Sequence, residues 1–379
     1  MHGESYQDFM LSKLVPVPGN IGESNLGMNP DLVNEIATDV DVIINSAANT
    51  TFDERFDVAV NINTKGPSQI LNFAKQCKKL CCFIHVSTAY VTMGNLGETL
   101  TSKTTPLSHP PVDVDAEVKL ALHSSLAFHR GAEVTQKMKE MGLERTEEEI
   151  PVAIVRPSIV ESTFREPFPG WIQGNRMIDP VAIAYGKGHL PAFLNPKTVI
   201  DIIPVDMVVN AIISAVAKHG IARKPGLNVY HVSSSGVNPV TFADIFDFLY
   251  EHFKSYPLKD VKGNTVDIKR VKIFSSVEDV LPCISKAVME RYGVASGPDG
   301  LPRKFCERII DQSTKMVKTY EPYYTSRWFD STETYKLWEA MSEDEKLNFG
   351  FDVKSLDWRN YFINIHVPGL RKYVIKNGR

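Results

Sequence analysis

The first two thirds of the chain alternate between two hydrophobic patterns. Short runs of consecutive apolar residues are typical of strands buried on both faces, and they occur at residues 40–45, 81–87, 152–155 and 228–232, with a shorter run at 13–17. Between the runs, apolar residues recur every three or four positions, which predicts helices at residues 29–38, 64–79 and 204–218. This alternation predicts an α/β fold of Rossmann type, a doubly wound parallel sheet with helices on both faces.

Two further regions complete the prediction. Residues 92–113, rich in Thr, Pro and Gly, predict a long loop, and residues 115–148 predict one or two helices. From about Val240 the helical pattern predominates, at residues 241–254, 303–318, 331–347 and 357–375. We therefore predict a first domain over residues 1–240 and a helical C-terminal domain over residues 270–379, with the boundary near 240–270.

Composition excludes several classes of protein. The 379 residues are 43% hydrophobic and 23% charged, and the net charge of -3 is too small to indicate nucleic-acid binding. The five cysteines show no metal-ligand spacing. Cys81 and Cys82, adjacent in an apolar strand, are expected to be reduced core residues, and a reducing compartment is favoured. No apolar run reaches the ~18 residues of a membrane span, and residues 1–5 lack the basic and apolar segments of a signal peptide.

Small and polar residues follow the first buried strand. Ser46, Ala47, Ala48 and Asn49 are predicted at its carboxyl end, where ligands bind in an open parallel sheet. Small side chains let a dinucleotide approach the backbone, and Asn49 offers a donor and an acceptor. A tight turn needs the same residues, so both interpretations stay open. Asn63, at the start of the next predicted helix, either orients a water or a carbonyl group or caps the helix.

Hydroxyl and charged residues follow the later strands. Ser87 and Thr88 come after the strand at 81–87, where a hydroxyl can polarise a substrate carbonyl group or can bond its own backbone in a turn. Arg156 either meets a phosphate or carboxylate or is a surface residue before the turn at Pro157. Asp206 most simply caps the helix predicted at 204–218.

Several segments together carry a family resemblance. They are Asp41–Arg55, Val86–Val91, Arg156–Val160, Glu166–Trp171, Ala184–Gly188, Phe351–Trp358 and Asn364–Leu370. Their order and spacing resemble those of plant-type alcohol-forming fatty acyl-CoA reductases, extended short-chain dehydrogenases/reductases with an added helical C-terminal domain. The resemblance covers nearly the whole chain.

The resemblance implies a reaction and a site. It implies that a long-chain fatty acyl-CoA is reduced with NADPH in two hydride steps, through an aldehyde, to a primary alcohol. It also implies that residues 1–240 bind NAD(P) and that residues 270–379 form the reductase C-terminal domain. By position, Thr88 would hold the carbonyl oxygen with Ser87 beside it, and Asn63 would belong to the proton relay. The residues expected to bind the cofactor are Ser46, Ala47, Ala48, Asn49 and Arg156.

Two motifs of the resembling family are missing. The residues before the strand at 40–45 contain no Gly-x-x-Gly-x-x-Gly turn, which binds the cofactor pyrophosphate, so the sheet is predicted to be incomplete at its N-terminal side. The Tyr-x-x-x-Lys segment expected before residue 152 is absent, and no tyrosine lies between Tyr90 and Tyr185. Loss of a general acid typically lowers a rate by roughly 10²–10⁴-fold. Tyr250 and Lys254 fit the spacing, but we interpret this as a chance match on a later helix.

These gaps leave alternative functions open. The chain is an acyl-CoA reductase of doubtful activity, or an inactive relative that binds acyl-CoA or a protein partner. A sugar-nucleotide epimerase or dehydratase on the same fold is disfavoured by the Glu166–Trp171 segment and by the aromatic tail. An incomplete sheet would expose strand edges and an apolar face, so we expect a chain that folds poorly alone or an incomplete version of a longer protein.

The C-terminal segment raises the question of membrane contact. Its aromatic residues predict an acyl-chain tunnel, a membrane-surface contact or an ordinary aromatic core. The basic residues Arg371, Lys372, Lys376 and Arg379 contact anionic lipid or end a solvated helix. Members of the resembling family act at the surface of the endoplasmic reticulum or in plastids. The sequence does not predict an oligomeric state.

Overall fold

The computed structural model describes most of the chain, namely residues 6–51, 54–90, 99–100, 150–194, 197–260, 263–292, 303–320 and 328–375. The loop predicted at 92–113 lies outside the described residues except for Thr99–Leu100, and the helices predicted at 115–148 lie wholly outside them.

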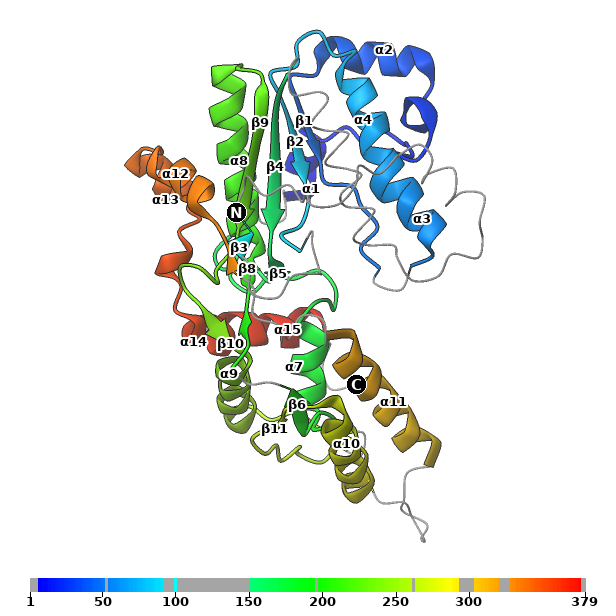
Figure 1. Cartoon of the computed structure of the whole chain (residues 1–379), viewed down its shortest axis with the longest axis vertical. Coiled ribbons are helices and arrows are strands. Elements are labelled where there is room, and N and C mark those ends of the chain that lie inside the picture. Colours follow the sequence, from blue (N-terminus) through cyan, green and yellow to red (C-terminus); the bar gives the residue numbers. More distant parts are fainter. Residues whose placement is uncertain are drawn as a thin grey trace.

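A parallel sheet occupies one end of the long axis of the molecule (Figure 1). Its described strands, in spatial order, are β1 (Val42–Asn45), β2 (Cys82–Val86), β4 (Pro151–Pro157) and β9 (Gly226–Val232). Every neighbouring pair is parallel. These strands confirm the four main apolar runs. The strand predicted at 13–17 is wrong: this segment forms no strand, and Val15 is 84% exposed because no described element covers it.

Helices cover both faces of the sheet, which confirms the doubly wound prediction. On one face, Ile70 and Leu71 of α4 (Gly66–Ala74) pack against Phe83 and Ile154, and α2 (Pro30–Asp39) packs on α4. On the other face lies α8 (Val205–Ala222), whose buried residues join the strand side chains in one core. The core residues of α8 are Met207, Val208, Ala211 and Ala215.

Helix α8 also bears on the membrane question. By length and composition, it is the one described helix apolar enough to cross a membrane. Asp206 and Lys218 interrupt its apolar sequence, so it contains no uninterrupted apolar run of that length. In this structure α8 covers the sheet, with its small and apolar side chains on the strands.

Strand β1 is less covered than its sequence predicts. Ile44 is 49% exposed, whereas its partner in register on β2, Ile84, is fully buried. Among the described residues, β1 pairs with β2 alone. The prediction that both faces of this strand are buried is therefore wrong at Ile44, and the exposed side chain fits the expectation of an incomplete sheet.

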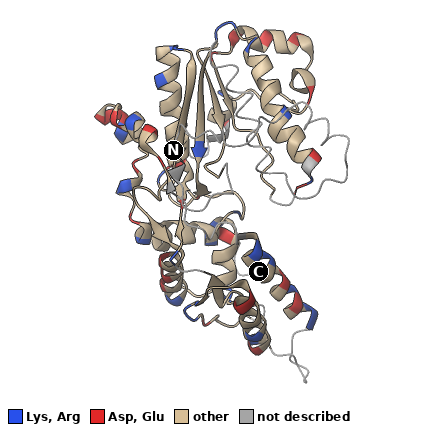
Figure 2. Cartoon of the chain, in the orientation of Figure 1, with Lys and Arg blue, Asp and Glu red and all other residues tan. Residues whose placement is uncertain are grey.

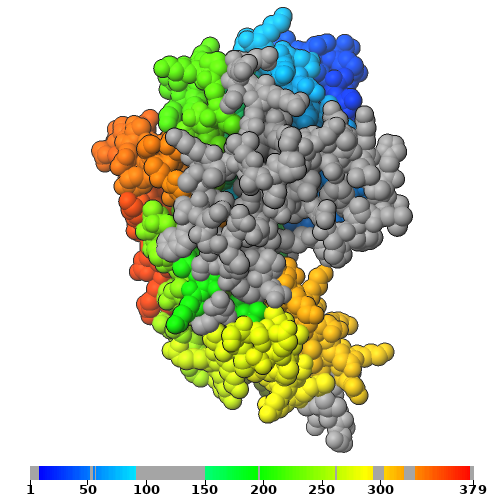
Figure 3. Space-filling model, viewed as in Figure 1, coloured from blue at the N-terminus to red at the C-terminus, as the bar shows by residue number. Residues whose placement is uncertain are grey.

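The other end of the molecule is mainly helical (Figure 1). Residues 277–292 and 303–320, yellow to light orange, form much of its surface in the space-filling view (Figure 3). Its helices are α7 (Asp179–Gly186), α9 (Phe242–Ser255), α10 (Val277–Tyr292) and α11 (Arg303–Tyr320). Its two-stranded pairs are β5 (Ile159–Glu161) with β8 (Ile202–Pro204), β6 (Ala192–Leu194) with β11 (Lys272–Phe274), and β7 (Val199–Ile200) with β10 (Val240–Thr241). Residues before 240 thus pair with residues after it. The domain boundary at 240–270 stays a prediction.

The C-terminal segment returns along the molecule. It contains α12 (Thr332–Glu339), α13 (Glu343–Asn348), α14 (Trp358–Asn360), a π-helical stretch at Tyr361–His366 and α15 (Val367–Tyr373), while β12 (Trp328–Phe329) pairs with β3 (Thr99–Leu100). The single helix predicted at 331–347 is split because Ser342 and Glu345 form a capping box that starts α13.

The tail aromatic residues with described side chains mostly belong to the core. Tyr361 and Phe362 are fully buried, and Phe351 and Trp358 are nearly so, in the same cluster as α9. This supports the interpretation as an ordinary aromatic core. Charged residues of both signs lie on α10 and α11 (Figure 2), and membrane contact stays a prediction.

A carboxylate holds the loop between the two ends of the molecule. The oxygens of Asp206 accept hydrogen bonds from the backbone N–H groups of Phe164, Arg165 and Glu166, at 2.8, 2.7 and 3.0 Å. Asp206 lies in the first turn of α8, whose cap residue is Pro204. The prediction that Asp206 caps this helix is wrong, because its side chain is used on the neighbouring loop.

Two segments that carry the family resemblance meet at a pair of glycines. Gly170, in the segment 166–171, has φ +75°, and Gly369 of α15 packs directly on it. A Cβ atom on Gly369 would lie 1.9 Å from the carbonyl oxygen of Gly170. Only two residues without side chains allow the backbones to approach so closely.

We predict that Gly369→Ala destabilises the protein by about 1–3 kcal/mol, because the added methyl group overlaps backbone that cannot move aside. The control is Gly220→Ala in α8, where the new Cβ atom would lie 3.8 Å from Cys82 Sγ and alanine favours the helix. Urea unfolding followed by circular dichroism measures both. Equal stability of the two variants would contradict the packing argument.

We predict that Ile44→Thr reduces aggregation on heating and changes the free energy of unfolding by less than about 0.5 kcal/mol, as for other exposed positions. The matched variant Ile84→Thr should lower stability by about 2 kcal/mol or more, because it buries a hydroxyl group in the core. Light scattering and urea unfolding separate the two effects. Unchanged aggregation of Ile44→Thr would show that this strand is not the exposed surface that associates.

Candidate functional site

The predicted site residues lie at one edge of the sheet. Asn45 pairs with His85 and Val86 pairs with Val155, so β1, β2 and β4 end side by side. The N–H of Ser87 continues the pattern by donating to the carbonyl oxygen of Val155 at 2.7 Å. The structure therefore brings the segments 46–49 and 87–88 together at the carboxyl edge, as predicted.

The loop after β1 is fixed by a reciprocal amide contact. The N–H of Asn49 donates to Asn63 Oδ1 at 2.8 Å, and Asn63 Nδ2 donates to the carbonyl oxygen of Asn49 at 2.9 Å. One side-chain amide thus satisfies both backbone groups of one loop residue, much as a neighbouring strand would. Asn63 serves to orient a backbone carbonyl group, which is one of its two predicted roles.

The other predicted role of Asn63, as a helix cap, is wrong. The helical segment begins earlier, with α3 (Phe56–Val60), and continues through a π-helical turn at Asn61–Lys65 into α4. Asn63 lies inside the wide turn. A π-helical turn breaks the regular spacing of apolar residues, so the sequence pattern placed the helix start too late.

The side chain of Asn49 is used within its own loop. Its Nδ2 donates to Glu54 Oε2 at 2.8 Å, and its Oδ1 accepts from the N–H of Thr51 at 2.9 Å. Ser46, Ala47 and Ala48 are exposed and small. The segment is therefore a tight turn that also leaves the backbone at the sheet edge open to a ligand.

Thr88 presents a hydroxyl group at this edge. Its Oγ1 accepts a hydrogen bond from the N–H of Tyr90 at 3.2 Å, which fixes the oxygen in a short turn. Among the contacts of the described residues, its hydroxyl hydrogen is donated to none. A half-buried hydroxyl with a fixed oxygen and a free hydrogen can donate to a ligand.

Arg156 lies inside the protein. It is 4% exposed, and its Nη1 is 3.4 Å from His231 Nε2 on the adjacent strand β9. Burial, and then the charge of Arg156, lower the pKa of His231 to about 4. A neutral His231 with Nδ1–H donating to the carbonyl oxygen of Asp330 at 3.1 Å leaves Nε2 to accept from Arg156. The alternative of a surface arginine is wrong, and a phosphate contact of Arg156 stays a prediction.

Sequence reasoning missed two buried polar groups. Asn45 Nδ2 lies 3.1 Å from His85 Nδ1, and both residues are buried at paired positions of β1 and β2. Polar residues within two otherwise apolar strands were a signal for this pair. The second group, Glu161, Asp179 and His366, is drawn from three distant segments, and no local pattern indicates it. Burial, then the neighbouring Asp179, raise the pKa of Glu161 well above its ordinary value.

A surface depression lies beside the carboxyl end of β9. Its apolar and aromatic lining side chains include Val237 from the loop after β9, Tyr335 and Trp338 from α12, and Phe351 from the segment after α13. Phe329, which lines the neighbouring hollow, also packs edge-on against Tyr90 with ring centres 5.1 Å apart. The depression thus adjoins the segment that carries Thr88.

Comparisons with known proteins agree with this geometry. A family model described as Male sterility protein, an NAD-binding domain, matches residues 2–212, and a second model of the same description matches residues 296–377. Fatty acyl-CoA reductase 2, chloroplastic, of Arabidopsis thaliana is 44% identical over 99% of this chain and 68% of its own length. The chain belongs to the fatty acyl-CoA reductase family. The alcohol-forming fatty acyl-CoA reductase of Simmondsia chinensis is 33% identical over 98% of this chain and 84% of its own length.

Solved structures show the same fold at low sequence identity. The terminal R domain from the myxalamid PKS-NRPS biosynthetic pathway matches 97% of this chain and 78% of its own length, with a TM-score of 0.65 and 16% identity. This likeness shows the Rossmann-like reductase fold. The NAD-binding family domain indicates a nicotinamide cofactor for residues 2–212.

The relatives have residues that this chain lacks. The alignment with the chloroplastic reductase spans 422 positions, whereas the chain has 379 residues, so at least 43 aligned positions have no counterpart here. The missing Tyr-x-x-x-Lys segment noted in the sequence is consistent with such gaps. The interpretation of Tyr250 and Lys254 as a chance match to this motif stays a prediction. Both residues lie on α9, where Lys254 pairs with Asp267 and Arg270 lies over the ring of Tyr250.

The described residues fit part of a dinucleotide. The exposed small residues 46–48 allow close approach of a ligand to the backbone, and Thr88 offers a donor beside them. The Gly-x-x-Gly-x-x-Gly spacing of a pyrophosphate-binding turn does not occur in the residues before β1.

We predict that Asn63→Ala lowers stability by about 1–3 kcal/mol, because the N–H and carbonyl groups of Asn49 lose their shared partner. Asn72→Ala is the matched control, since Asn72 is exposed on α4, the helix that continues from the π-helical turn. Thermal unfolding and hydrogen exchange at Asn49 provide the measurements. Unchanged protection of this amide would show that the reciprocal contact does not hold the loop.

Proposed function

We propose that this protein is an NADPH-dependent reductase that converts long-chain fatty acyl-CoA to primary fatty alcohols. Two kinds of support point the same way. The family relationship extends over nearly the whole chain, and relatives named as fatty acyl-CoA reductases include an alcohol-forming one. The single structural observation that carries the proposal is the Thr88 hydroxyl at the carboxyl edge. Its oxygen accepts from the N–H of Tyr90, and no described residue accepts its hydrogen.

Thr88 has the chemistry for polarising a carbonyl group. A hydroxyl hydrogen donated to the oxygen of a thioester or aldehyde stabilises the negative charge that develops when hydride reaches the carbon. The bound cofactor supplies that hydride. Asn63 contributes indirectly, because it holds the loop at Asn49. The exposed residues 46–48 leave room for the cofactor to lie on the sheet edge.

We infer that the turnover of this chain is low. Each reduced carbonyl oxygen needs a proton, and the family supplies it from a tyrosine whose Tyr-x-x-x-Lys segment is missing from this sequence. The absence of a general acid predicts a rate roughly 10²–10⁴-fold below that of an intact relative. The second candidate function, an inactive member that binds acyl-CoA, rests on the same missing segment.

The depression beside β9 is the proposed acyl-chain surface. Half of the side chains that line it are apolar or aromatic. Phe329 of the neighbouring hollow packs against Tyr90, in the segment that carries Thr88. A plastid is the proposed compartment, because a relative sharing 44% identity is named as chloroplastic.

The test combines NADPH fluorescence, acyl-CoA binding and NADPH consumption with palmitoyl-CoA. We expect binding of both ligands, slow consumption, and a further loss of about 10²-fold in kcat for Thr88→Val, with recovery in Thr88→Ser, as for other donors to a developing oxyanion. Binding of acyl-CoA without NADPH would favour the inactive module. Equal rates for Thr88→Val and the unmodified chain would refute the role of the hydroxyl group.

A further inference from the structure

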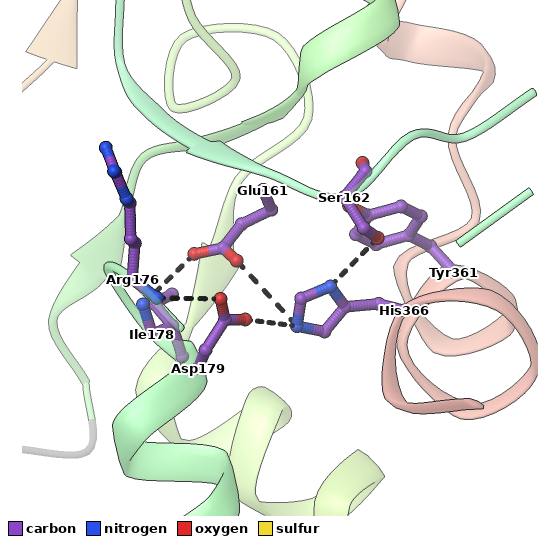
Figure 4. A network of polar contacts seen from close by, with 7 residues as sticks. All are labelled: Glu161, Ser162, Arg176, Ile178, Asp179, Tyr361 and His366. Carbon is purple, nitrogen blue, oxygen red and sulfur yellow. Dashed lines mark hydrogen bonds and ion pairs between the residues drawn. The ribbon is translucent and has the colours of Figure 1, made fainter. Parts of the chain in front are cut away.

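Three buried side chains from distant segments converge on one point (Figure 4). Glu161 ends β5, Asp179 begins α7, and His366 closes the π-helical stretch before α15. His366 Nε2 lies 3.3 Å from Asp179 Oδ1 and 3.7 Å from Glu161 Oε2, and the three side chains are at most 1% exposed. Among the residues that the structure describes, none of these three atoms has a hydrogen-bond partner.

Every other polar atom of the three side chains is held in place. Glu161 Oε1 accepts from the N–H of Ile178 at 3.1 Å, and Asp179 Oδ2 accepts from the N–H of Arg176 at 3.0 Å. His366 Nδ1 lies 3.0 Å from Ser162 Oγ. Each side chain is thus anchored through one atom and presents its other atom to the shared point.

The hydroxyl groups behind His366 fix its tautomer in a form that suits a ligand. Tyr361 donates its hydroxyl hydrogen to the carbonyl oxygen of Ser162 at 2.7 Å, so its oxygen can accept from Ser162 Oγ at 3.2 Å. Ser162 Oγ then accepts from His366 Nδ1–H. A histidine that donates through Nδ1 carries its lone pair on Nε2, which is the usual arrangement of a metal-bound imidazole.

The spacing and charge of the cluster match a divalent ion. Zinc–ligand bonds of about 2.0–2.2 Å in a tetrahedral site separate neighbouring ligand atoms by about 3.4 Å, close to the 3.3 and 3.7 Å observed here. In the form that binds a metal ion, two carboxylates and a neutral imidazole would carry a charge of -2, which a divalent cation would balance. Magnesium is disfavoured because it retains several waters, and these side chains are sealed from solvent.

We propose that Glu161, Asp179 and His366 bind a divalent transition-metal ion, with zinc the best match to the nitrogen and oxygen donors. The ion would join β5, α7 and the C-terminal segment. Its effect would extend to the sheet edge, because Arg176, whose N–H anchors Asp179, also reaches Thr50 Oγ1 at 3.4 Å in the loop after β1. The role proposed is therefore structural, and it is independent of the proposed reductase activity.

The experiment measures metal in the full chain purified without chelators. We expect about one zinc per chain by mass spectrometry of the metal, and a melting temperature about 5 °C lower after removal of the metal, restored by zinc sulfate. Cobalt in place of zinc should give visible absorption bands more intense than those of the hydrated ion, as expected when protein side chains replace most of its waters. This readout does not depend on activity.

Variants distinguish metal binding from a network in which the three side chains share protons and hold no metal ion. Glu161→Gln and His366→Gln should bind zinc at least tenfold more weakly and lose the rise in melting temperature. The control is His252→Gln, because His252 is also buried, with Nδ1 2.9 Å from the carbonyl oxygen of Ile363. If His366→Gln does not fold, Glu161→Gln and the cobalt spectrum of the unmodified chain decide.

Two outcomes would overturn the metal site. One is a chain without bound metal whose melting temperature does not respond to zinc or manganese. The other is a Glu161→Gln variant as stable as the parent. An amide can replace a protonated carboxyl group in a hydrogen-bonded network, but it cannot replace a charged carboxylate that binds a metal ion. Either outcome leaves the proposed reductase function intact, because none of the three residues belongs to the Thr88 edge.

Discussion

Parallel pairing of the central strands is the constraint on which the rest of the structure depends. Because β1, β2 and β4 run in the same direction, their carboxyl ends meet at one edge, and residues from separate segments become neighbours there. The turns at these ends need small residues and hydroxyl groups for their own hydrogen bonds. The same atoms are those that a dinucleotide and a carbonyl group can approach, so turn chemistry and site chemistry coincide.

A second constraint joins the sheet to the helical part of the molecule. The loop after β5 is held from one side by the Asp206 carboxylate and from the other by the contact of Gly170 with Gly369. Both contacts involve backbone atoms, which do not adjust as side chains do. This explains why the segments 166–171 and 364–370, nearly two hundred residues apart, show the family resemblance together: each shapes the surface on which the other packs.

Sequence patterns predicted the elements that depend on apolar periodicity and on strand order. They did not predict the features that depend on contacts between distant segments. The four buried strands and helix α8 follow from apolar spacing alone. The short run at 13–17 has the same local pattern, but a strand also needs a partner, and pattern does not supply one. The functions of Asp206 and Asn63 could not be read from local rules, because each side chain bonds backbone in a segment distant in sequence. The cluster of Glu161, Asp179 and His366 had no signal, since its members share neither a motif nor a spacing.

The proposed reductase function has two requirements, which are positioning of the carbonyl group and delivery of a proton. In the proposed function, strand ends and turn geometry position the carbonyl group, and β2 with its following turn is the candidate for this role. The family resemblance implies that a Tyr-x-x-x-Lys segment delivers the proton, and this sequence lacks that segment. The first requirement is a consequence of the fold, whereas the second is an addition to it. We therefore propose that a family member without the proton source can keep an edge that binds the carbonyl group, so that binding and turnover are not lost together.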